Sequence, residues 1–252
     1  ADYTASASAV TIDVTDAVAL RRLMDGKRAV LNCVGPYFRF GPPILSAAID
    51  AGVDYLDVCD DWQPTLTMLA QSDAAVAAGV RAVIGQGASP GTCNLLAAAA
   101  ADAVGADAAG EVHRLVTGGS LEDEPGDESG AANEPWLHQS TGLIRVWREM
   151  GYVDEPPLAD VSVEFPGLER RIAVTIGHPE AVTLPRRYPG LRLCLNTMTL
   201  PGGLLATLRR AAAAVESGAL PMMEASRRIL GDHAPGRGPH LPSYPGVWAI
   251  AE

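Results

Sequence analysis

Short apolar runs alternate with helical patterns along the first part of the chain. Ala29 to Val34 is an apolar run between two basic residues and a Gly-Pro pair, which is typical of a strand buried on both faces. Ile44 to Ala51 then carries apolar residues at helical spacing, and Gly52 suits a left-handed residue at the helix end. Tyr55 to Val58 is a second buried run. Strand, helix and strand at this spacing predict a βαβ unit with parallel strands.

The same alternation extends this unit in both directions. A stiff loop of Gly and Pro residues, 35–43, is expected between the first strand and its helix. Further strands are predicted at Thr11–Val14 and Val80–Ile84, and further helices at Asp16–Asp25, Pro64–Ala78 and Asn94–Val104.

The pattern changes after residue 110. Strands are predicted at Val112–Thr117, Val161–Phe165, Arg171–Ile176, Leu191–Asn196 and from Val247, and helices at Ser140–Met150, Leu204–Glu216 and Met222–Leu230. We therefore expect an α/β protein, with a partial Rossmann-like parallel sheet in residues 1–110. A second α+β domain with a mainly antiparallel sheet follows in residues 111–252.

Ligands of open parallel sheets bind beyond the carboxyl ends of the strands. Here those ends are Asn32–Tyr37 and Asp57–Asp61, so the candidate site begins there. Asp61 has two interpretations, as an acid–base group beside Asp60 or as the cap of the helix that starts near Pro64. Tyr37 either packs on a flat ring or covers the sheet edge.

Two later stretches carry further candidates. The glycine-rich segment GQGASPG, residues 85–91, enters an Ala-rich helix, whose N-terminus suits an anion, but no Lys-Ser or Lys-Thr follows as in a P-loop. His178 stands in a Gly-His-Pro turn, where it acts either as an acid or base near neutral pH or as a structural residue. The acidic stretch 118–135 reads as a mobile loop or a lid.

The stretch NCVGPYFRFGPPILSAAIDAGVDYLDV resembles the saccharopine dehydrogenase family, in which a strand enters an N-x-x-G-P-[YF] loop, then a helix, then Ala-Gly-x-x-Tyr-x-Asp. GQGASPGTCNLLA, GHPEAVTLPRRYPGL and a Gly-Val-Trp at 246–248 agree with it. The resemblance implies hydride transfer with NAD or NADP at a CH–NH or imine carbon of an amino-acid-like substrate.

The resemblance and the chemistry of the residues together nominate site residues, although the family pattern does not itself identify the catalytic acid or base. Nicotinamide is expected against 32–37, and adenine near the strand at 11–14. The catalytic candidates are Asp61 and His178; the cofactor-binding candidates are Asp13, Val14, Asn32, Gly35, Pro36, Tyr37 and Asp57; the substrate-binding candidates are Arg39, whose guanidinium suits a carboxylate, Pro90, Gly91 and Asn94.

One departure from the family pattern is the absence of a G-x-G-x-x-G motif before Ala29. We expect either that about one βαβ unit is missing at the front or that the usual dinucleotide contact has been lost. The alternatives to a dehydrogenase are a non-catalytic binding or scaffold protein on the same fold, and an enoyl-reductase-like member of the family that reduces a carbon–carbon double bond.

Charge and composition restrict the partners. A net charge of −11 argues against nucleic acid and anionic membranes, and no apolar run reaches the length of a membrane span. Three of the four scattered cysteines stand in apolar or strand contexts, so buried free thiols in a reducing compartment are the default, and none has metal-ligand spacing with a histidine. We expect a cytoplasmic protein without a metal site that binds a small-molecule substrate, and the family resemblance implies a homodimer.

Overall fold

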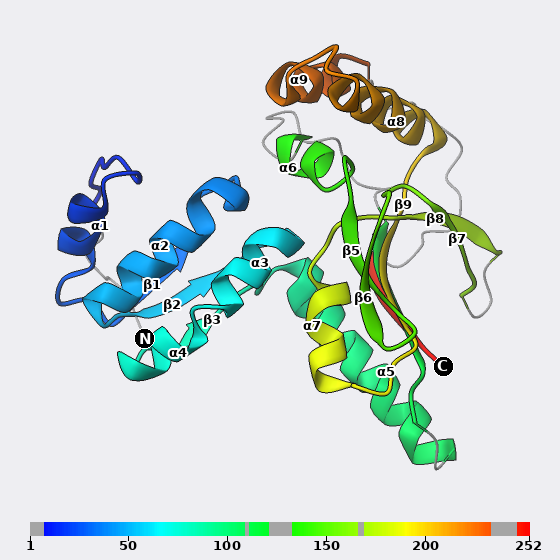
Figure 1. The fold of residues 1–252 in the computed structure, drawn as a ribbon, viewed down its shortest axis with the longest axis horizontal. Coiled ribbons are helices and arrows are strands. Elements are labelled where there is room, and N and C mark those ends of the chain that lie inside the picture. The colour runs from blue at the N-terminus through cyan, green and yellow to red at the C-terminus, as the bar shows by residue number, and fades with distance from the viewer. Residues whose placement is uncertain (1–7, 109–110, 121–132, 166–168, 233–245) are drawn as a thin grey trace, which may run out of the picture.

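The computed structural model describes residues 8–108, 111–120, 133–165, 169–232 and 246–252. Two lobes lie side by side, one around each of two sheets (Figure 1). We call residues 8–87 the first lobe and the described residues from 88 onward the second lobe. The predicted boundary between residues 110 and 111 stays a prediction; helix α5 (Cys93–Ala108) packs on the second sheet.

The first lobe contains a parallel sheet of order β1-β2-β3, as the alternating pattern predicted. Ala29 pairs with Asp54 and Asn32 with Asp57, so the carboxyl ends of β1 and β2 lie together. Its elements are α1 (Ala17–Met24), β1 (Ala29–Asn32), α2 (Tyr37–Ala51), β2 (Asp54–Asp57), α3 (Trp62–Leu69), α4 (Ser72–Ala77) and β3 (Ala82–Val83).

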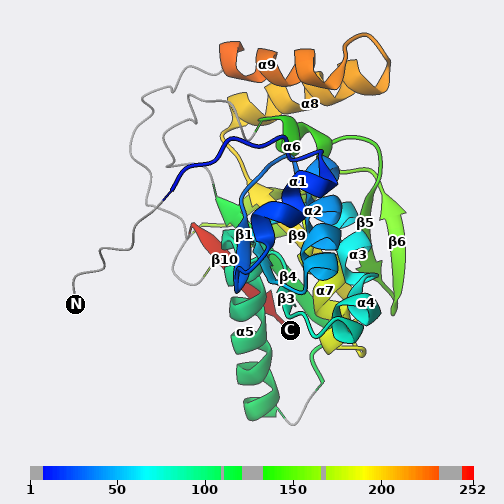
Figure 2. The ribbon, with the colours of Figure 1, turned by 90° about the vertical axis from the view of Figure 1, so that its left-hand side faces the viewer.

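One face of this sheet carries the core of the first lobe. Side chains from α1 to α4 pack against Tyr55, which is fully buried, and Figure 2 shows these helices gathered beside the strands. On the opposite face, Leu31, Leu56 and Val83 are neighbours in register and are exposed. The described residues therefore cover this sheet on one side.

Two predictions in the first lobe were wrong. Thr11 to Val14 is not a strand, because the Asp13 side chain accepts hydrogen bonds from Thr15 and turns the chain into α1. The predicted loop 35–43 is largely helical, since α2 begins at Tyr37 and includes Pro42 and Pro43. The predicted helix 64–78 is divided between α3 and α4.

The second lobe is built on a seven-stranded mixed sheet in which β4 and β9 are parallel and the other pairs are antiparallel. The fold class is therefore confirmed. Besides α5, its elements are η1, a short π-helical turn (Ala88–Thr92), β4 (Arg114–Ser120), α6 (Asn133–His138), β5 (Ile144–Arg148), β6 (Gly151–Glu155), β7 (Asp160–Val163), β8 (Arg171–Thr175), α7 (Glu180–Arg187), β9 (Leu193–Thr199), α8 (Gly202–Glu216), α9 (Met222–Asp232) and β10 (Val247–Ala251).

The prediction of a helix over Ser140–Met150 was also wrong. This segment contains β5, which forms an antiparallel pair with β6. Ile144 and Val146 are buried while Arg145 between them reaches Asp154 on β6, an alternation that belongs to a strand. Of the acidic stretch 118–135, residues 118–120 are in β4, 133–135 begin α6, and 121–132 lie outside the described residues.

The lobes meet where α3 approaches the turn before α7. A Cβ atom on Gly177 would lie 3.0 Å from Trp62 Cδ1 and 2.8 Å from Ile144 Cγ2, so glycine is required for this approach. The Arg145 guanidinium lies over the Trp62 ring, 5.1 Å from its centroid. None of the helices in the described residues has the length and apolar character of a membrane span.

Candidate functional site

A buried hydrogen-bond network joins the carboxyl ends of the three parallel strands. Asn32 Nδ2 donates to Tyr55 Oη at 3.0 Å, and Tyr55 Oη donates to Asp57 Oδ2 at 2.8 Å. The other oxygen of Asp57 accepts from the Gly85 amide at 2.7 Å and the Cys59 amide at 3.0 Å. These contacts hold the strand ends at one edge of the sheet.

The polar groups of this network are engaged with one another. Asn32 and Asp57 are 2% and 0% exposed, and Tyr37 Oη donates to the Asn32 carbonyl at 2.8 Å. Burial raises the pKa of the Asp57 carboxyl, and burial likewise raises the pKa values of Tyr37 and Tyr55. Asn32, Tyr37 and Asp57 therefore frame the edge. Gly35, between Asn32 and Pro36, is exposed with open space around its Cα.

Asp61 is the second buried carboxylate at this edge, and it reaches into the second lobe. Oδ1 caps α3 by accepting from the Gln63 amide at 3.4 Å. Oδ2 lies 2.7 Å from Nδ1 of His138, at the end of α6. The two atoms are within ion-pair distance but do not meet hydrogen-bond geometry as they stand; because an ionised carboxylate only accepts, its proximity favours a hydrogen on Nδ1. A neutral ring then has its lone pair on Nε2, and the His138 side chain is 25% exposed.

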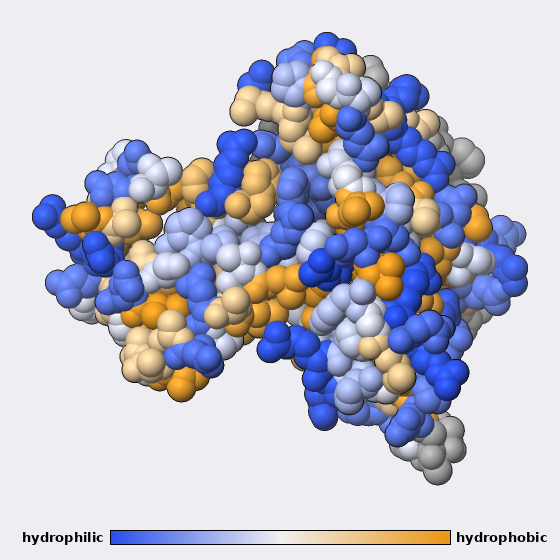
Figure 3. All heavy atoms as spheres, in the orientation of Figure 1, coloured by the Kyte–Doolittle hydropathy of each residue, from blue (hydrophilic) through white to orange (hydrophobic). Residues whose placement is uncertain are grey.

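Aromatic and charged contacts from α2 surround His138. The Phe38 ring stacks on the His138 ring with centroids 4.3 Å apart. Arg39, a substrate-binding candidate, forms a salt bridge of 3.2 Å with Glu134 of α6. The start of α2 and the end of α6 thus meet beside Asp61, and the space-filling view shows the molecule's outline hollowed between the first lobe and the helices above α6 (Figure 3).

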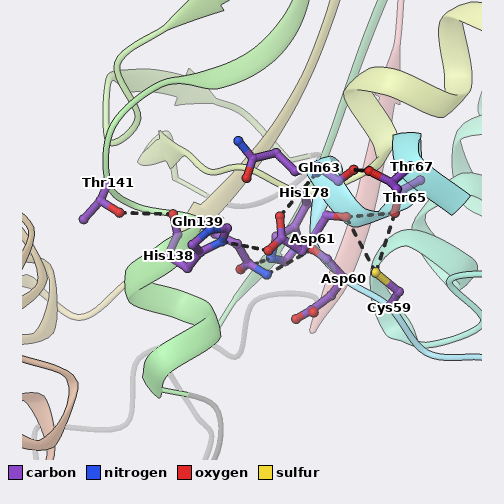
Figure 4. Close-up of polar contacts among 10 residues, drawn as sticks. All are labelled: Cys59, Asp60, Asp61, Gln63, Thr65, Thr67, His138, Gln139, Thr141 and His178. Carbon is purple, nitrogen blue, oxygen red and sulfur yellow. Dashed lines mark hydrogen bonds and ion pairs between the residues drawn. The ribbon is translucent and has the colours of Figure 1, made fainter. Parts of the chain in front are cut away.

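A second histidine cluster is buried behind the first. His178 Nδ1 lies 2.6 Å from Ser89 Oγ, and Ser89 Oγ lies 2.5 Å from Glu180 Oε1. His178 Nε2 lies 2.9 Å from Gln139 Oε1, and Gln139 Nε2 donates to the Asp60 carbonyl at 3.1 Å (Figure 4). Both ring nitrogens of His178 have protein partners, so the ring as placed has none left for a substrate.

The remaining predicted residues lie outside the two histidine clusters. Pro90 and Gly91 pack against the turn at Gly85, where a Cβ on Gly91 would lie 2.9 Å from the Gly85 carbonyl oxygen. Asn94 Nδ2 donates to Thr183 Oγ1 at 3.1 Å and lines a cavity of about 210 Å³ between α5 and α7. Asp13 and Val14 precede α1, and the Thr15 hydroxyl lowers the pKa of Asp13.

Sequence reasoning missed His138 and Gln139. They come after a segment without a clear pattern, and their partners are far away in sequence, so no local signal indicates the contacts. The structure brings Asp61 and His178 to the two ends of one buried cluster through these residues. Among the described residues, no group of three His, Cys, Asp or Glu side chains is arranged to bind a metal ion.

A family model matches the first third of the chain. Residues 1–83 match the family model of the saccharopine dehydrogenase NADP binding domain. A probable mitochondrial saccharopine dehydrogenase-like oxidoreductase of Arabidopsis thaliana is 45% identical over 53 residues, 21% of this chain and 12% of that protein. A saccharopine dehydrogenase-like oxidoreductase of Mus musculus is 33% identical over 54 residues, 21% of this chain and 13% of that protein.

Among solved structures, apo saccharopine dehydrogenase (L-Glu forming) from Saccharomyces cerevisiae has the same fold over most of this chain. The TM-score is 0.54 at 15% identity, and the match covers 91% of this chain and 58% of the yeast protein. The similarity at this identity concerns the fold alone. The cofactor prediction, NAD or NADP, is confirmed at the level of the matched domain, which is an NADP binding domain.

Proposed function

We propose that this chain serves NAD(P)-dependent hydride transfer at an amine- or imine-bearing carbon of an amino-acid-like substrate, because residues 1–83 match the family model of the saccharopine dehydrogenase NADP binding domain. The Asp61–His138 pair carries the proposal. It lies beside the carboxyl edge of the parallel sheet, where ligands of such sheets bind.

The residues at this edge fit a flat ring. Gly35 has no side chain and is exposed, and Val58, at the end of β2, is 38% exposed and apolar. Nicotinamide, when bound, would supply the hydride acceptor or donor. Gly35, Pro36 and Val58 are the residues proposed to contact it, while Asn32 and Asp57 hold the strand ends in place.

His138 is proposed to exchange the proton that accompanies hydride transfer. During oxidation of an amine, the carbon gives up a hydride and the nitrogen gives up a proton, and a neutral Nε2 accepts that proton. Asp61 keeps the hydrogen of the neutral ring on Nδ1 and stabilises the imidazolium that forms. The Phe38 ring fixes the plane of the imidazole by stacking on it.

The test is a titration of NADPH and NADH into the chain by calorimetry, followed by a panel of amino acids and imines with the tighter nucleotide. We expect saturable binding of a nucleotide and its oxidation or reduction with one class of amino-acid-like substrate. Absence of binding by both nucleotides would contradict the proposal and favour the scaffold alternative. Turnover only with a conjugated carbon–carbon double bond would favour the enoyl-reductase alternative.

A further inference from the structure

Gln139 is 1% exposed and connects three parts of the molecule. Its side-chain amide donates to the Asp60 carbonyl of the first lobe and accepts from His178 of the second. Its carbonyl oxygen accepts from the Gly177 amide at 3.0 Å. It also directly follows His138, so whatever holds Gln139 also holds the end of α6 against the loop that carries Asp61 (Figure 4).

The orientation of this amide follows from its partners. The Asp60 carbonyl only accepts, so the group that faces it is the NH₂ of Gln139. The oxygen of Gln139 therefore faces His178, and His178 Nε2 must carry a hydrogen to donate to it. These contacts thus place a hydrogen on Nε2 of His178 and leave the state of Nδ1 to be decided by its other partners.

The other nitrogen of His178 shares a proton with Ser89 and Glu180. The Ser89 hydroxyl has one hydrogen and two short contacts, of 2.6 Å to His178 Nδ1 and 2.5 Å to Glu180 Oε1. If Ser89 donates to Glu180, then His178 Nδ1–H donates to Ser89. If Ser89 donates to His178, then a protonated Glu180 donates to Ser89. Both arrangements hold the same number of protons.

The surroundings of Glu180 favour keeping that proton. The side chain is completely buried, and burial raises the pKa of its carboxyl. The groups that face it are His178, Ser89 and the thiols of Cys93 and Cys194, from α5 and β9. Burial also raises the pKa of Cys93, to about 12, and that of Cys194. If neither His178 Nδ1 nor Glu180 carried the shared proton, the single hydroxyl hydrogen of Ser89 could serve only one of its two short contacts. The other contact would then bring two acceptor atoms together.

We propose that Gln139 is a positioning residue: held by the Ser89–His178–Glu180 chain, it fixes His138 against Asp61 across the two lobes. The effect of this on catalysis rests on the proposed function, whereas the contact between the lobes does not. Among the described residues, the Gln139 side chain makes no hydrogen bond to the His138 ring or to the Asp61 carboxylate. Its effect on them therefore passes through the backbone, from Gln139 to His138 and from Asp60 to Asp61.

The test compares Gln139→Leu, which removes both side-chain hydrogen bonds at similar bulk, with Gln63→Leu at an exposed position three residues after Asp60. Amide hydrogen exchange is followed over residues 59–66 and 138–142. We expect exchange in both segments of Gln139→Leu to be about tenfold faster and unchanged in Gln63→Leu. Equal exchange in Gln139→Leu and the unaltered chain would overturn the proposal.

Gln139→Glu provides the conservative rescue. A protonated Glu at this position donates to the Asp60 carbonyl and accepts from His178, whereas an ionised one loses the first bond. Slow exchange at low pH that becomes fast as the new carboxyl ionises is the expected result. Exchange as fast as in Gln139→Leu at every pH would contradict the proposal, and this variant serves as the test if Gln139→Leu does not fold.

Kinetics separate this proposal from the proposed function. If the chain turns over a substrate, Gln139→Leu should lower kcat about tenfold while the KM for the nucleotide changes less than about twofold, because the misplaced group is the proton acceptor. If no substrate is turned over, the proposed function fails, and the exchange comparison still decides whether Gln139 holds the two segments together.

Discussion

The molecule contains two histidine–carboxylate clusters with one glutamine between them. They differ in whether the second ring nitrogen of the histidine has a protein partner. His138 is bound by Asp61 on one nitrogen and its side chain is a quarter exposed. His178 is 5% exposed and has Ser89 on one nitrogen and Gln139 on the other. The same residue types thus build an open pair suited to proton exchange and a closed cluster suited to holding the lobes. The type of residue alone does not decide its role.

The largest effect should come from breaking the open pair. His138→Gln is expected to lower kcat by roughly 10²–10⁴-fold, the usual contribution of a positioned acid or base, with nucleotide affinity unchanged. The matched control is His113→Gln, since His113 is exposed and its backbone hydrogen bonds go to Glu252, Arg192 and Leu193. Equal activity of the two variants would remove His138 from the mechanism.

Breaking the closed cluster should instead affect stability. His178→Leu leaves Gln139 Oε1 buried without a donor, which we expect to lower the free energy of unfolding by about 1–3 kcal/mol. Urea denaturation of His178→Leu and of the exposed control His113→Leu measures the difference. A His178→Leu variant as stable as its control would mean that the closed cluster does not hold the fold.

Separating the two lobes should have a smaller effect. Gly177→Ala places a methyl group 3.0 Å from Trp62 and 2.8 Å from Ile144, which is expected to cost about 1–2 kcal/mol as the side chains shift. The control is Gly203→Ala, because a Cβ atom on Gly203, at the start of α8, would meet no other atom within 4 Å. Gly142 does not serve as a control, since its positive φ would strain an alanine. We expect Gly203→Ala to be neutral or slightly stabilising by thermal denaturation; equal melting temperatures for the two variants would contradict the close approach at Gly177.

The smallest expected effect is the dependence of stability on pH that comes from Glu180 in the closed cluster. The pKa of Glu180 is raised in the folded chain above the ordinary value of 4.5, so the folded state keeps a proton that the unfolded state loses. Stability should therefore fall as pH rises from about 4.5 through the folded pKa, by at most about 1.4 kcal/mol per pH unit. Glu180→Gln, which also donates to Ser89, should remove this slope.

Urea denaturation of the unaltered chain and of Glu180→Gln at a series of pH values measures that slope. Asp57 also has a raised pKa, but it is present in both chains, so the difference between them isolates Glu180. Parallel stability profiles of the two chains would show that Glu180 does not retain the proton.

The sequence predicted the strands and the helix that position the site better than it predicted the side chains proposed to act there. Periodicity located β1, the C-terminal end of α2 at Gly52 and β2, because a buried parallel strand and an amphipathic helix each leave a local pattern. Asp61 was placed by the same logic, and it both caps α3 and binds a histidine. One oxygen of Asp61 caps α3, which confirms the capping interpretation, while the acid–base interpretation stays a prediction.

The rest depended on contacts that have no local pattern. Asp61 and His138 approach one another only after the second lobe has folded beside the first. The segment 140–150 was predicted as a helix because its apolar residues fit both periods, although the alternation of Ile144 and Val146 with Arg145 favoured a strand. Arg39 has a protein partner, Glu134, which comes from α6, a helix that the sequence did not reveal.

The central claim is that the two histidines hold their hydrogens on opposite nitrogens. A long-range proton–nitrogen NMR spectrum of the ¹⁵N-labelled chain, recorded where the rings are neutral and assigned with His138→Gln and His178→Leu, reads the state of each ring directly. The account predicts a hydrogen on Nδ1 and a free Nε2 for His138, and a hydrogen on Nε2 for His178. A hydrogen on Nε2 of His138 would mean that Asp61 does not orient this ring, and the proposed proton acceptor would be lost.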